Sequence, residues 1–537
     1  MMHKHRGPAR NPLVPSAMVL ALAAAGQSAI GAELANNDSV TIRWDNSVKY
    51  TLGARTASPS SFYLDNPNSN DGDGAFKKGG LVSNRVDLLT EFDFALKDAA
   101  NSGLRVSAAG WYDAVYRKSH EPIDPATYNP TSVANDQFTS YARKWAGANA
   151  ELYDAFVHSG FDLGGHNLSF RLGRHTLTWG ESLFLASNGI AGGQAPVDVH
   201  KVLTVPGIQA KDFLMPVNQL SAAFSLTPNL DLAGYYQLEF RPTRLMAPGT
   251  FLSPADVVFD GAERLILGPG FAVPRSASQE PPERKGQWGV SAKYRNPASS
   301  WDFGAYYLRY TDKTPQLYLG LNSAFVPSNY FFVYPQNIEL FGLSASTHVG
   351  DASVAGEVSV RNNTPLTSLG SALVVIPGVN DNADGRSNPL YAVGRSLHAQ
   401  VSTIWQIPRV PLWDTATLVG ELGANTLLKT TRNDAARDTN TSRTAVMIGT
   451  QFEPGWYQVL PDIDISVPLT LSYNFNDKTP AVAGPGGARG GNLALGLKFT
   501  YANGLKGGIT YTKYLGADDK NAFGDRDFVT FNLLYSF

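Results

Sequence analysis

The chain has 537 residues, a net charge of -2 and no cysteine. A charge balance near zero, without a basic stripe, excludes a nucleic-acid-binding surface, and the absence of cysteine excludes disulfides, thiolate metal sites and cysteine nucleophiles. The length fits either several soluble domains or one large barrel, so the order of the predicted elements has to decide.

The amino terminus has the three parts of a signal peptide. Basic residues such as Lys4 and Arg10 precede an apolar run over 17–25, and small residues follow near Ala32. The run is too short for a membrane helix, and no later stretch reaches the roughly twenty apolar residues that a helical span needs. We therefore expect a signal peptide over 1–32 and one domain over 33–537 that spans a membrane, if at all, as a closed barrel.

The first predicted strand covers 40–55 and separates apolar from charged side chains with a period of two. One face carries Val40, Ile42, Trp44, Val48, Tyr50 and Leu52, and the other carries Arg43, Asp45, Ser47, Lys49, Thr51 and Arg55. A charge facing lipid would cost about 2–4 kcal/mol at mid-depth, so the charged face is expected to line the lumen.

The next strands continue this pattern and place acids and arginines together in the lumen. Candidates for the solute path are Arg85, Asp87, Glu91, Asp93, Trp111, Asp113, Glu357 and Arg361. Inward charges of both signs also pair and hydrate one another in any wide barrel, so contact with solute is only one explanation. The mixed signs predict no strong preference for anions or cations.

Period-two patterns recur along the whole chain and predict an all-β, antiparallel transmembrane barrel of about eighteen strands, with sixteen as the alternative count. The remaining strands are expected at 84–96, 104–117, 150–160, 166–178, 217–226, 229–240, 286–296, 300–311, 337–349, 351–361, 394–407, 414–427, 443–455, 462–475, 491–501, 505–514 and 527–537. The patterns at 150–160, 166–178 and 337–349 are ambiguous in phase. Short turns alternate with long loops, which predicts both termini on the periplasmic side.

The last strand ends in an aromatic residue. Phe531, Tyr535 and Phe537 share the lipid face of DFVTFNLLYSF, which is similar to the terminal signal that the assembly machinery of bacterial outer-membrane barrels reads. The alternative is the edge strand of a soluble sandwich, but such an edge normally carries a charge or a proline.

Several long connections are too apolar for solvated loops, and we expect 178–217 and 240–286 to fold into the lumen as a plug or constriction. Their apolar candidates are Phe184, Leu185, Val205, Phe213, Phe251 and Phe259. These segments either bury only against each other or also line a pocket for an apolar solute, because pockets combine apolar walls with a few polar groups.

No catalytic or metal motif stands out in the sequence. His158 with Ser159, and His175 with Thr176, are neighbours that point to opposite faces of a strand and cannot act as nucleophile and base. The acidic run over 68–74 lacks the closing glutamate of an EF-hand, so a solvated loop is favoured over a calcium site. We expect no enzyme activity, cofactor or metal.

Six stretches together resemble a known family. LVSNRVDLLTEFDF, GWYDAVY, GRHTLTWGE, PGIQAKDFLMPVNQLSAAFSL, PGTFLSPADV and EVSVRNNTPL are similar to a proteobacterial family of outer-membrane proteins catalogued as domain of unknown function 1302. The resemblance covers nearly the whole mature chain. It implies an outer-membrane barrel, often encoded beside exporter-type transporters and catabolic genes for hydrophobic compounds, and it assigns no catalytic residues.

These observations predict an outer-membrane channel or transporter for hydrophobic or amphipathic small molecules. The alternatives are a porin for small polar solutes, an outer-membrane lipid hydrolase and a structural partner of an inner-membrane export system. Expected partners are outer-membrane lipid and lipopolysaccharide, the barrel-assembly machinery, a hydrophobic cargo and an inner-membrane transporter.

Overall fold

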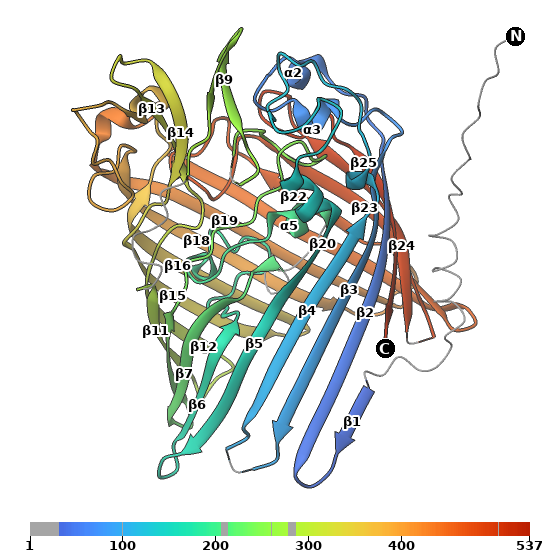
Figure 1. The fold of residues 1–537 in the computed structure, drawn as a ribbon. Coiled ribbons are helices and arrows are strands. Elements are labelled where there is room, and N and C mark those ends of the chain that lie inside the picture. Colours follow the sequence, from blue (N-terminus) through green and yellow to red (C-terminus); the bar gives the residue numbers. More distant parts are fainter. Residues whose placement is uncertain (1–31, 99, 206–212, 259, 278–285, 503) are drawn as a thin grey trace, which may run out of the picture.

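The structure is a computed structural model that describes residues 32–98, 100–205, 213–258, 260–277, 286–502 and 504–537. Within these residues, one antiparallel sheet of 20 strand segments closes on itself (Figure 1). Two segments, β21 (Ile463–Ser466) and β22 (Leu469–Asn474), are halves of one predicted strand, and β1 (Ala32–Asn36) pairs only with β2. The wall therefore has 18 strands, as predicted.

The strands of the wall agree with the predicted ranges to within a few residues. Besides β21 and β22, they are β2 (Val40–Arg55), β3 (Leu81–Leu96), β4 (Gly103–Asp113), β5 (Ala148–Asp162), β6 (Asn167–His175), β7 (Val217–Thr227), β8 (Leu230–Gln237), β11 (Trp288–Arg295), β12 (Asp302–Tyr310), β15 (Ile338–Val349), β16 (Ala352–Pro365), β18 (Val393–Ile407), β19 (Thr415–Arg432), β20 (Thr444–Leu460), β23 (Gly490–Tyr501), β24 (Leu505–Leu515) and β25 (Phe528–Ser536). Each pairs with its neighbours in chain order.

The barrel closes where β25 meets β2. The register runs from Ser47 opposite Ser536 to Arg55 opposite Phe528. Beyond β25, Phe537 and Asn46 exchange two backbone N–H···O bonds of 2.8 Å each. Phe537 therefore continues the backbone pairing between β25 and β2.

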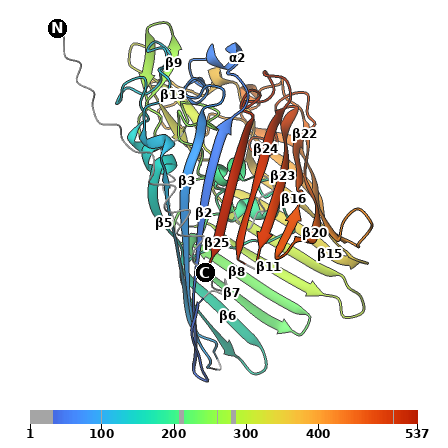
Figure 2. The ribbon, with the colours of Figure 1, turned by 90° about the vertical axis from the view of Figure 1, so that its right-hand side faces the viewer.

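Alternating side chains make the outer face apolar. Large apolar residues that point outward and are exposed include Trp44, Tyr112, Val157, Phe303, Phe341, Leu343, Val401, Leu422, Leu495 and Phe531. They come from strands all around the wall, whose side is seen in Figure 2. An apolar surface of this extent on a closed barrel is the kind that faces lipid.

The ambiguous phase of the strand near 150–160 has a structural cause. The register between β4 and β5 shifts between Val106 and Ala108. At this bulge, two successive residues of β5 face the lumen: Tyr153 lines a cavity and Asp154 lies 3.6 Å from Arg105. One extra residue moves every later side chain to the other face, so no single period fits the strand.

Short turns join the strands at one end of the barrel and long connections join them at the other (Figure 1). The long connections carry α2 (Ser61–Leu64), α3 (Asp71–Gly74), η1 (Val115–Arg117), α4 (Ser140–Ala142), η2 (Arg143–Gly147), η3 (Ile190–Gly193), α5 (Val199–Thr204), β9 (Arg264–Gly268), β10 (Phe271–Pro274), β13 (Gln316–Leu321), β14 (Pro327–Val333), η4 (Gly370–Ala372), β17 (Val374–Val375) and η5 (Asp434–Ala436). Both β1 and the end of β25 lie toward the short turns.

None of the helices in the described ranges is long and apolar enough to cross a membrane. Residues 1–31 of the expected signal peptide lie outside the described residues, so the expected cleavage stays a prediction.

The acidic run that was expected to be a solvated loop is buried, and this expectation was wrong. Asp71 and Asp73 are both 0% exposed. Arg55 Nη2 lies 2.6 Å from Asp73 Oδ1 and 3.1 Å from Asp525 Oδ2. Because a buried arginine neutralises Asp73 and the Asn129 N–H donates to Asp71 at 3.1 Å, the run can leave water without binding a metal. In the part of the chain that the structure describes, no three acidic or histidine side chains converge as a metal site.

The same cluster joins three long connections. Arg526 Nη1 donates to the carbonyls of Phe251 and Ser253, at 2.6 Å each, and Asp256 Oδ2 accepts the backbone N–H of Asp71 at 2.9 Å. We call Arg55, Asp71, Asp73, Asp256, Asp525 and Arg526 the buried charge cluster. It fixes the loops at the mouth of the barrel to one another.

Candidate functional site

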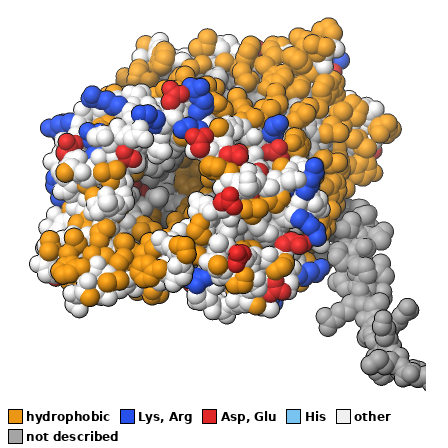
Figure 3. Space-filling model, turned by 90° about the horizontal axis from the view of Figure 1, so that it is seen from above, with side chains coloured by type: hydrophobic (Ala, Val, Ile, Leu, Met, Phe, Trp, Pro, Cys, Tyr) orange, Lys and Arg blue, Asp and Glu red, His pale blue; other side chains and the backbone are white. Residues whose placement is uncertain are grey.

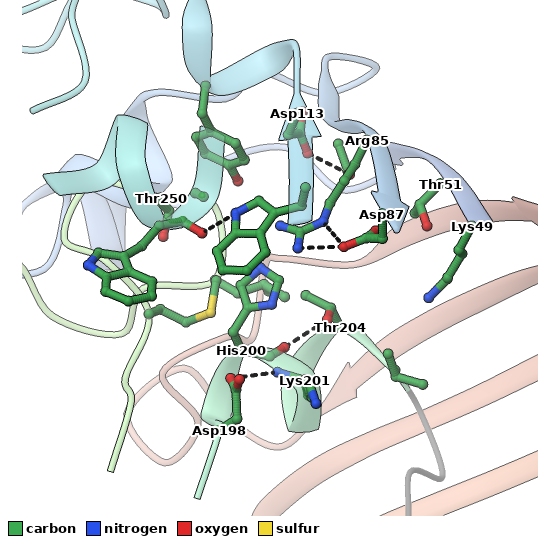
Figure 4. Close-up of a pocket in the computed structure, with 18 of the residues that line it drawn as sticks. Lys49, Thr51, Arg85, Asp87, Asp113, Asp198, His200, Lys201, Thr204 and Thr250 are labelled. Atoms are coloured by element: carbon green, nitrogen blue, oxygen red, sulfur yellow. Dashed lines mark hydrogen bonds and ion pairs between the residues drawn. The ribbon is translucent and has the colours of Figure 1, made fainter. Parts of the chain in front are cut away.

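A cavity of about 500 Å³ lies inside the barrel beneath these loops. Its walls are the inner faces of β2 to β5 and β25, together with α5 and the connection around 244–252 (Figure 4). Seen from the long-loop end, Figure 3 shows a hollow among the loops with acidic and basic side chains around it. The volume is within the range of small-molecule sites.

Strand register brings the lining side chains into rows. Leu534, Lys49, Asp87 and Trp111 are successive cross-strand partners on β25, β2, β3 and β4. All four line the cavity. Because residues two apart share a face, the next row toward the mouth contains Thr51, Arg85 and Asp113. A flat patch of wall thus carries apolar and charged groups side by side.

Arg85 is held by an acid and an aromatic ring. Its Nε and Nη2 donate to Asp87 Oδ1 at 2.8 and 2.7 Å, and its guanidinium lies 5.1 Å from the centre of the Trp111 ring. Trp111 in turn donates from Nε1 to the Trp145 carbonyl at 3.0 Å. These contacts fix the orientation of the guanidinium and the indole.

Asp113, at the end of β4, accepts hydrogen bonds from the neighbouring strand β3 and from η1. It accepts the Ser83 hydroxyl at 2.8 Å, the Asn84 N–H at 3.0 Å and the Val115 N–H at 2.9 Å. The Asp113 carboxylate therefore stabilises the backbone where β4 ends, and it is less available to a ligand than an unpaired carboxylate.

The opposite wall of the cavity comes from α5 and the connection after β8. Asp198 accepts from Arg244 Nη1 at 2.9 Å, and Arg244 Nη2 lies 2.6 Å from Glu151 Oε2. His200 faces the cavity from α5, and burial, helped by the charge of Arg85, lowers its pKa to about 4. At neutral pH the imidazole is uncharged and adds a polar contact without adding charge.

A second part of the β6–β7 connection is bound to another part of the wall. Glu357 accepts the N–H groups of Glu181 at 2.7 Å and Ile190 at 2.8 Å. Arg361 donates to the carbonyls of Asn188 and Gly189 at 2.7 and 2.9 Å. We call residues 181–190 the constriction segment, because they fold inward against the wall.

The predicted lumen residues fall into three groups. Arg85, Asp87, Trp111 and Asp113 line the cavity. Glu91 and Asp93 lie outside it and both pair with Arg105. Glu357 and Arg361 are 6% and 5% exposed beneath the constriction segment, where they bind backbone instead of facing an open path. Contact with solute stays a prediction for all eight.

The predicted apolar loop residues also lie in different parts of the barrel. Val205 and Phe251 line the cavity. Phe184 and Leu185 pack against glycines of the wall, where an added Cβ at Gly449 or Gly423 would lie 2.8 Å from them. Phe213 is 4% exposed in an apolar cluster with Ala186 and Leu214. Phe259 lies outside the described residues.

Sequence reasoning did not single out Lys49, Trp145, His200 or Met246, which also line the cavity. The alternation of the first strand did place Lys49 in the lumen. No local signal marks the other three, because they lie on connections whose folding is set by distant contacts.

Two serine–histidine pairs are present in the wall. His175 Nε2 lies 2.8 Å from Ser221 Oγ, and His398 Nε2 lies 2.9 Å from Ser396 Oγ. Both histidines are 1% exposed, and none of the four residues lines the cavity. His398 Nδ1 instead contacts the Asn188 side chain at 3.1 Å. A substrate carbonyl has no access to these hydroxyls in this conformation.

Solved structures of low sequence identity are similar to this chain. OccAB4 of Acinetobacter baumannii has 10% identity and a TM-score of 0.43, with 93% of this chain and 98% of that chain covered. The outer-membrane channel DcaP of the same species has 9% identity and a TM-score of 0.39, with 95% and 100% covered. OccK1 (OpdK) of Pseudomonas aeruginosa has 10% identity and a TM-score of 0.41, with 93% and 98% covered.

No curated protein matches the chain. The model of the family described as "Protein of unknown function (DUF1302)" matches residues 13–537, which is nearly the whole chain. The protein therefore belongs to the DUF1302 family.

Proposed function

We propose that this protein is an outer-membrane channel that passes amphipathic small molecules with a large apolar part, without a chemical step. The observation that carries the proposal is the cavity of about 500 Å³ within the lumen. Its wall combines apolar side chains such as Trp111, Met246 and Phe251 with charged side chains such as Lys49 and Arg85. Binding sites for small molecules usually have this composition.

The proposed location rests on the wall of the barrel. A closed barrel with an apolar outer face satisfies its backbone hydrogen bonds between strands and can face lipid on all sides. The proposal includes outer-membrane lipid, lipopolysaccharide and the assembly machinery as partners, with Phe531, Tyr535 and Phe537 as the assembly signal. An inner-membrane transporter would be the partner that receives or delivers the cargo.

The constriction segment supports a gated channel more than an open porin. It is held to the wall through Glu357, Arg361 and Glu421. A porin for small polar solutes would need this segment to lie aside from a wide water path. The hydrolase alternative has less support, because both serine–histidine pairs are buried away from the cavity.

Planar-bilayer conductance tests the proposal. The purified protein should show a small conductance that changes in a saturable way when an amphipathic solute is added. Deletion of residues 187–205 should raise the conductance, since the deletion removes α5 and part of the constriction segment. A large, steady conductance that no amphipathic solute alters would support the porin alternative instead.

A further inference from the structure

We infer that the cavity binds monocarboxylates with an apolar body, and that the ammonium group of Lys49 receives the carboxylate. This inference rests on the proposed function, because it names the class of amphipathic solute that the channel takes. It is carried by the state of each charged group around the cavity.

Lys49 has a carboxylate opposite it but does not pair with it. Lys49 and Asp87 are direct cross-strand partners on β2 and β3, and both line the cavity. Asp87 instead pairs with Arg85, whose Nε and Nη2 both donate to Asp87 Oδ1, at 2.8 and 2.7 Å. Among the lining residues that the structure describes, Lys49 has an ammonium group without a hydrogen bond or ion pair, whereas the Lys201 ammonium group lies 4.8 Å from the centre of the Tyr153 ring.

The other charges of the cavity are already satisfied. Arg85 is neutralised by Asp87, and Arg244 is neutralised by Asp198 and Glu151. Asp113 accepts three hydrogen bonds, two from β3 and one from η1. A ligand cation would therefore compete with arginines for Asp87 and Asp198. A ligand anion, by contrast, could bind the ammonium group of Lys49 without displacing an ion pair.

The surroundings of Lys49 fit a single negative charge on an apolar body. On one side its cross-strand partner is Leu534 of β25, an apolar side chain that faces the lumen. Across Asp87, the Trp111 ring is held by the Trp145 carbonyl and offers a fixed flat surface. One unpaired ammonium group matches a monoanion, and a flat or aliphatic body can cover Leu534 and Trp111.

Calorimetry with two probes of nearly equal shape tests the inference on the full-length protein in detergent. Cinnamate carries the carboxylate, and cinnamamide replaces it with a neutral amide. Cinnamate should bind the unaltered protein about tenfold more tightly, because a hydrogen bond to a charged group contributes more than a neutral one. Lys49→Met should remove this preference and leave cinnamamide affinity unchanged, while Lys49→Arg should keep it.

Lys498→Met is the matched control. Lys498 lies on β23 outside the cavity and pairs with Glu453 at 3.2 Å, so its loss should change neither affinity. Equal affinities of the two probes for the unaltered protein would overturn the carboxylate site but leave an amphipathic channel in place. If Lys49→Met weakens binding of both probes equally, the carboxylate site is likewise overturned and the amphipathic channel stays in place. Absence of binding of both probes would overturn the proposed function as well.

Discussion

Glu421 Oε2 on β19 accepts the backbone N–H of Leu185 at 2.7 Å. The same oxygen accepts the N–H of Leu183 at 3.1 Å and that of Phe184. One carboxylate therefore satisfies three successive donors of the constriction segment. Donors buried without a partner cost about 1–3 kcal/mol each, so this contact opposes detachment of the segment from the wall.

Glu421→Ala should loosen the constriction segment. Three backbone N–H groups would lose their acceptor in the wall, and hydrogen bonds to water would then be more favourable for them than the buried position. We expect a higher mean single-channel conductance, or frequent openings, in planar bilayers. Glu453→Ala is the control, because Glu453 of β20 binds Ser466 on β21 and Lys498 on β23 and, within the described residues, has no hydrogen bond or ion pair to the constriction segment. Equal conductance of both variants would show that this carboxylate does not hold a gate.

Trp111→Ala should weaken binding of charged and neutral probes alike. The indole supplies apolar area and no ionic contact, so cinnamate and cinnamamide should each lose about fivefold in affinity. Calorimetry on the full-length protein measures both. A loss confined to cinnamate would mean that Trp111 acts through the orientation of Arg85, whose guanidinium lies 5.1 Å from the ring centre.

The loops at the mouth should become more stable as pH falls. Burial raises the pKa of Asp256 from 3.8 to about 6, and burial followed by the charge of Asp73 raises that of Asp525 to about 6. A raised folded-state pKa contributes stability that is complete below about 3.8 and is lost as pH rises through about 6. Amide exchange of residues 249–256 should be slower at pH 5 than at pH 7.5 after correction for intrinsic rates.

Asp256→Asn tests the origin of that pH dependence. An amide cannot titrate, so the difference in protection between the two pH values should shrink. Asp260→Asn is the control, because Asp260 lies on the same connection but its side chain is 70% exposed. An undiminished pH effect in Asp256→Asn would assign the effect to another group.

Arg55→Met should destabilise the junction between the barrel and its loops. Arg55 is 1% exposed and neutralises Asp73 and Asp525. Its loss breaks the buried ion pairs with Asp73 and Asp525 and leaves Asp73 only the longer contact of 3.6 Å to Arg526. Breaking a buried pair by removing one partner costs about 3–5 kcal/mol. The free energy of unfolding in urea should fall by that amount. Arg409→Met is the control, because Arg409 is 79% exposed where it meets Asp414 and such pairs contribute little.

Deletion of Phe537 should slow assembly of the barrel. Phe537 exchanges two backbone hydrogen bonds with Asn46 across the seam, and its ring lies 5.7 Å from that of Tyr535. We expect a smaller folded fraction in outer-membrane extracts, measured by heat-modifiable gel mobility. Phe341→Ala removes another exposed ring of the outer face. If both changes reduce assembly equally, lost apolar area and not the terminal position is responsible.

The sequence by itself determined the barrel. Alternation of side chains along a strand is a local property, so the inward direction of Lys49, Arg85 and Asp87 followed from residues only two positions apart. The strand count and the alternation of short and long connections followed from the same pattern. Of the three strands with an ambiguous phase, the one near 150–160 contains the bulge at Tyr153 and Asp154, where one inserted residue reverses the faces.

Only the tertiary structure decided what fills the barrel. The acidic run looked like a solvated turn, yet Asp73 pairs with Arg55 and contacts Arg526, which lies at the far end of the chain. Glu421 and Arg361 found their partners in backbone groups of a connection more than 170 residues away. Such contacts depend on closure of the barrel, which brings distant strands and loops into one lumen, and no local periodicity encodes them.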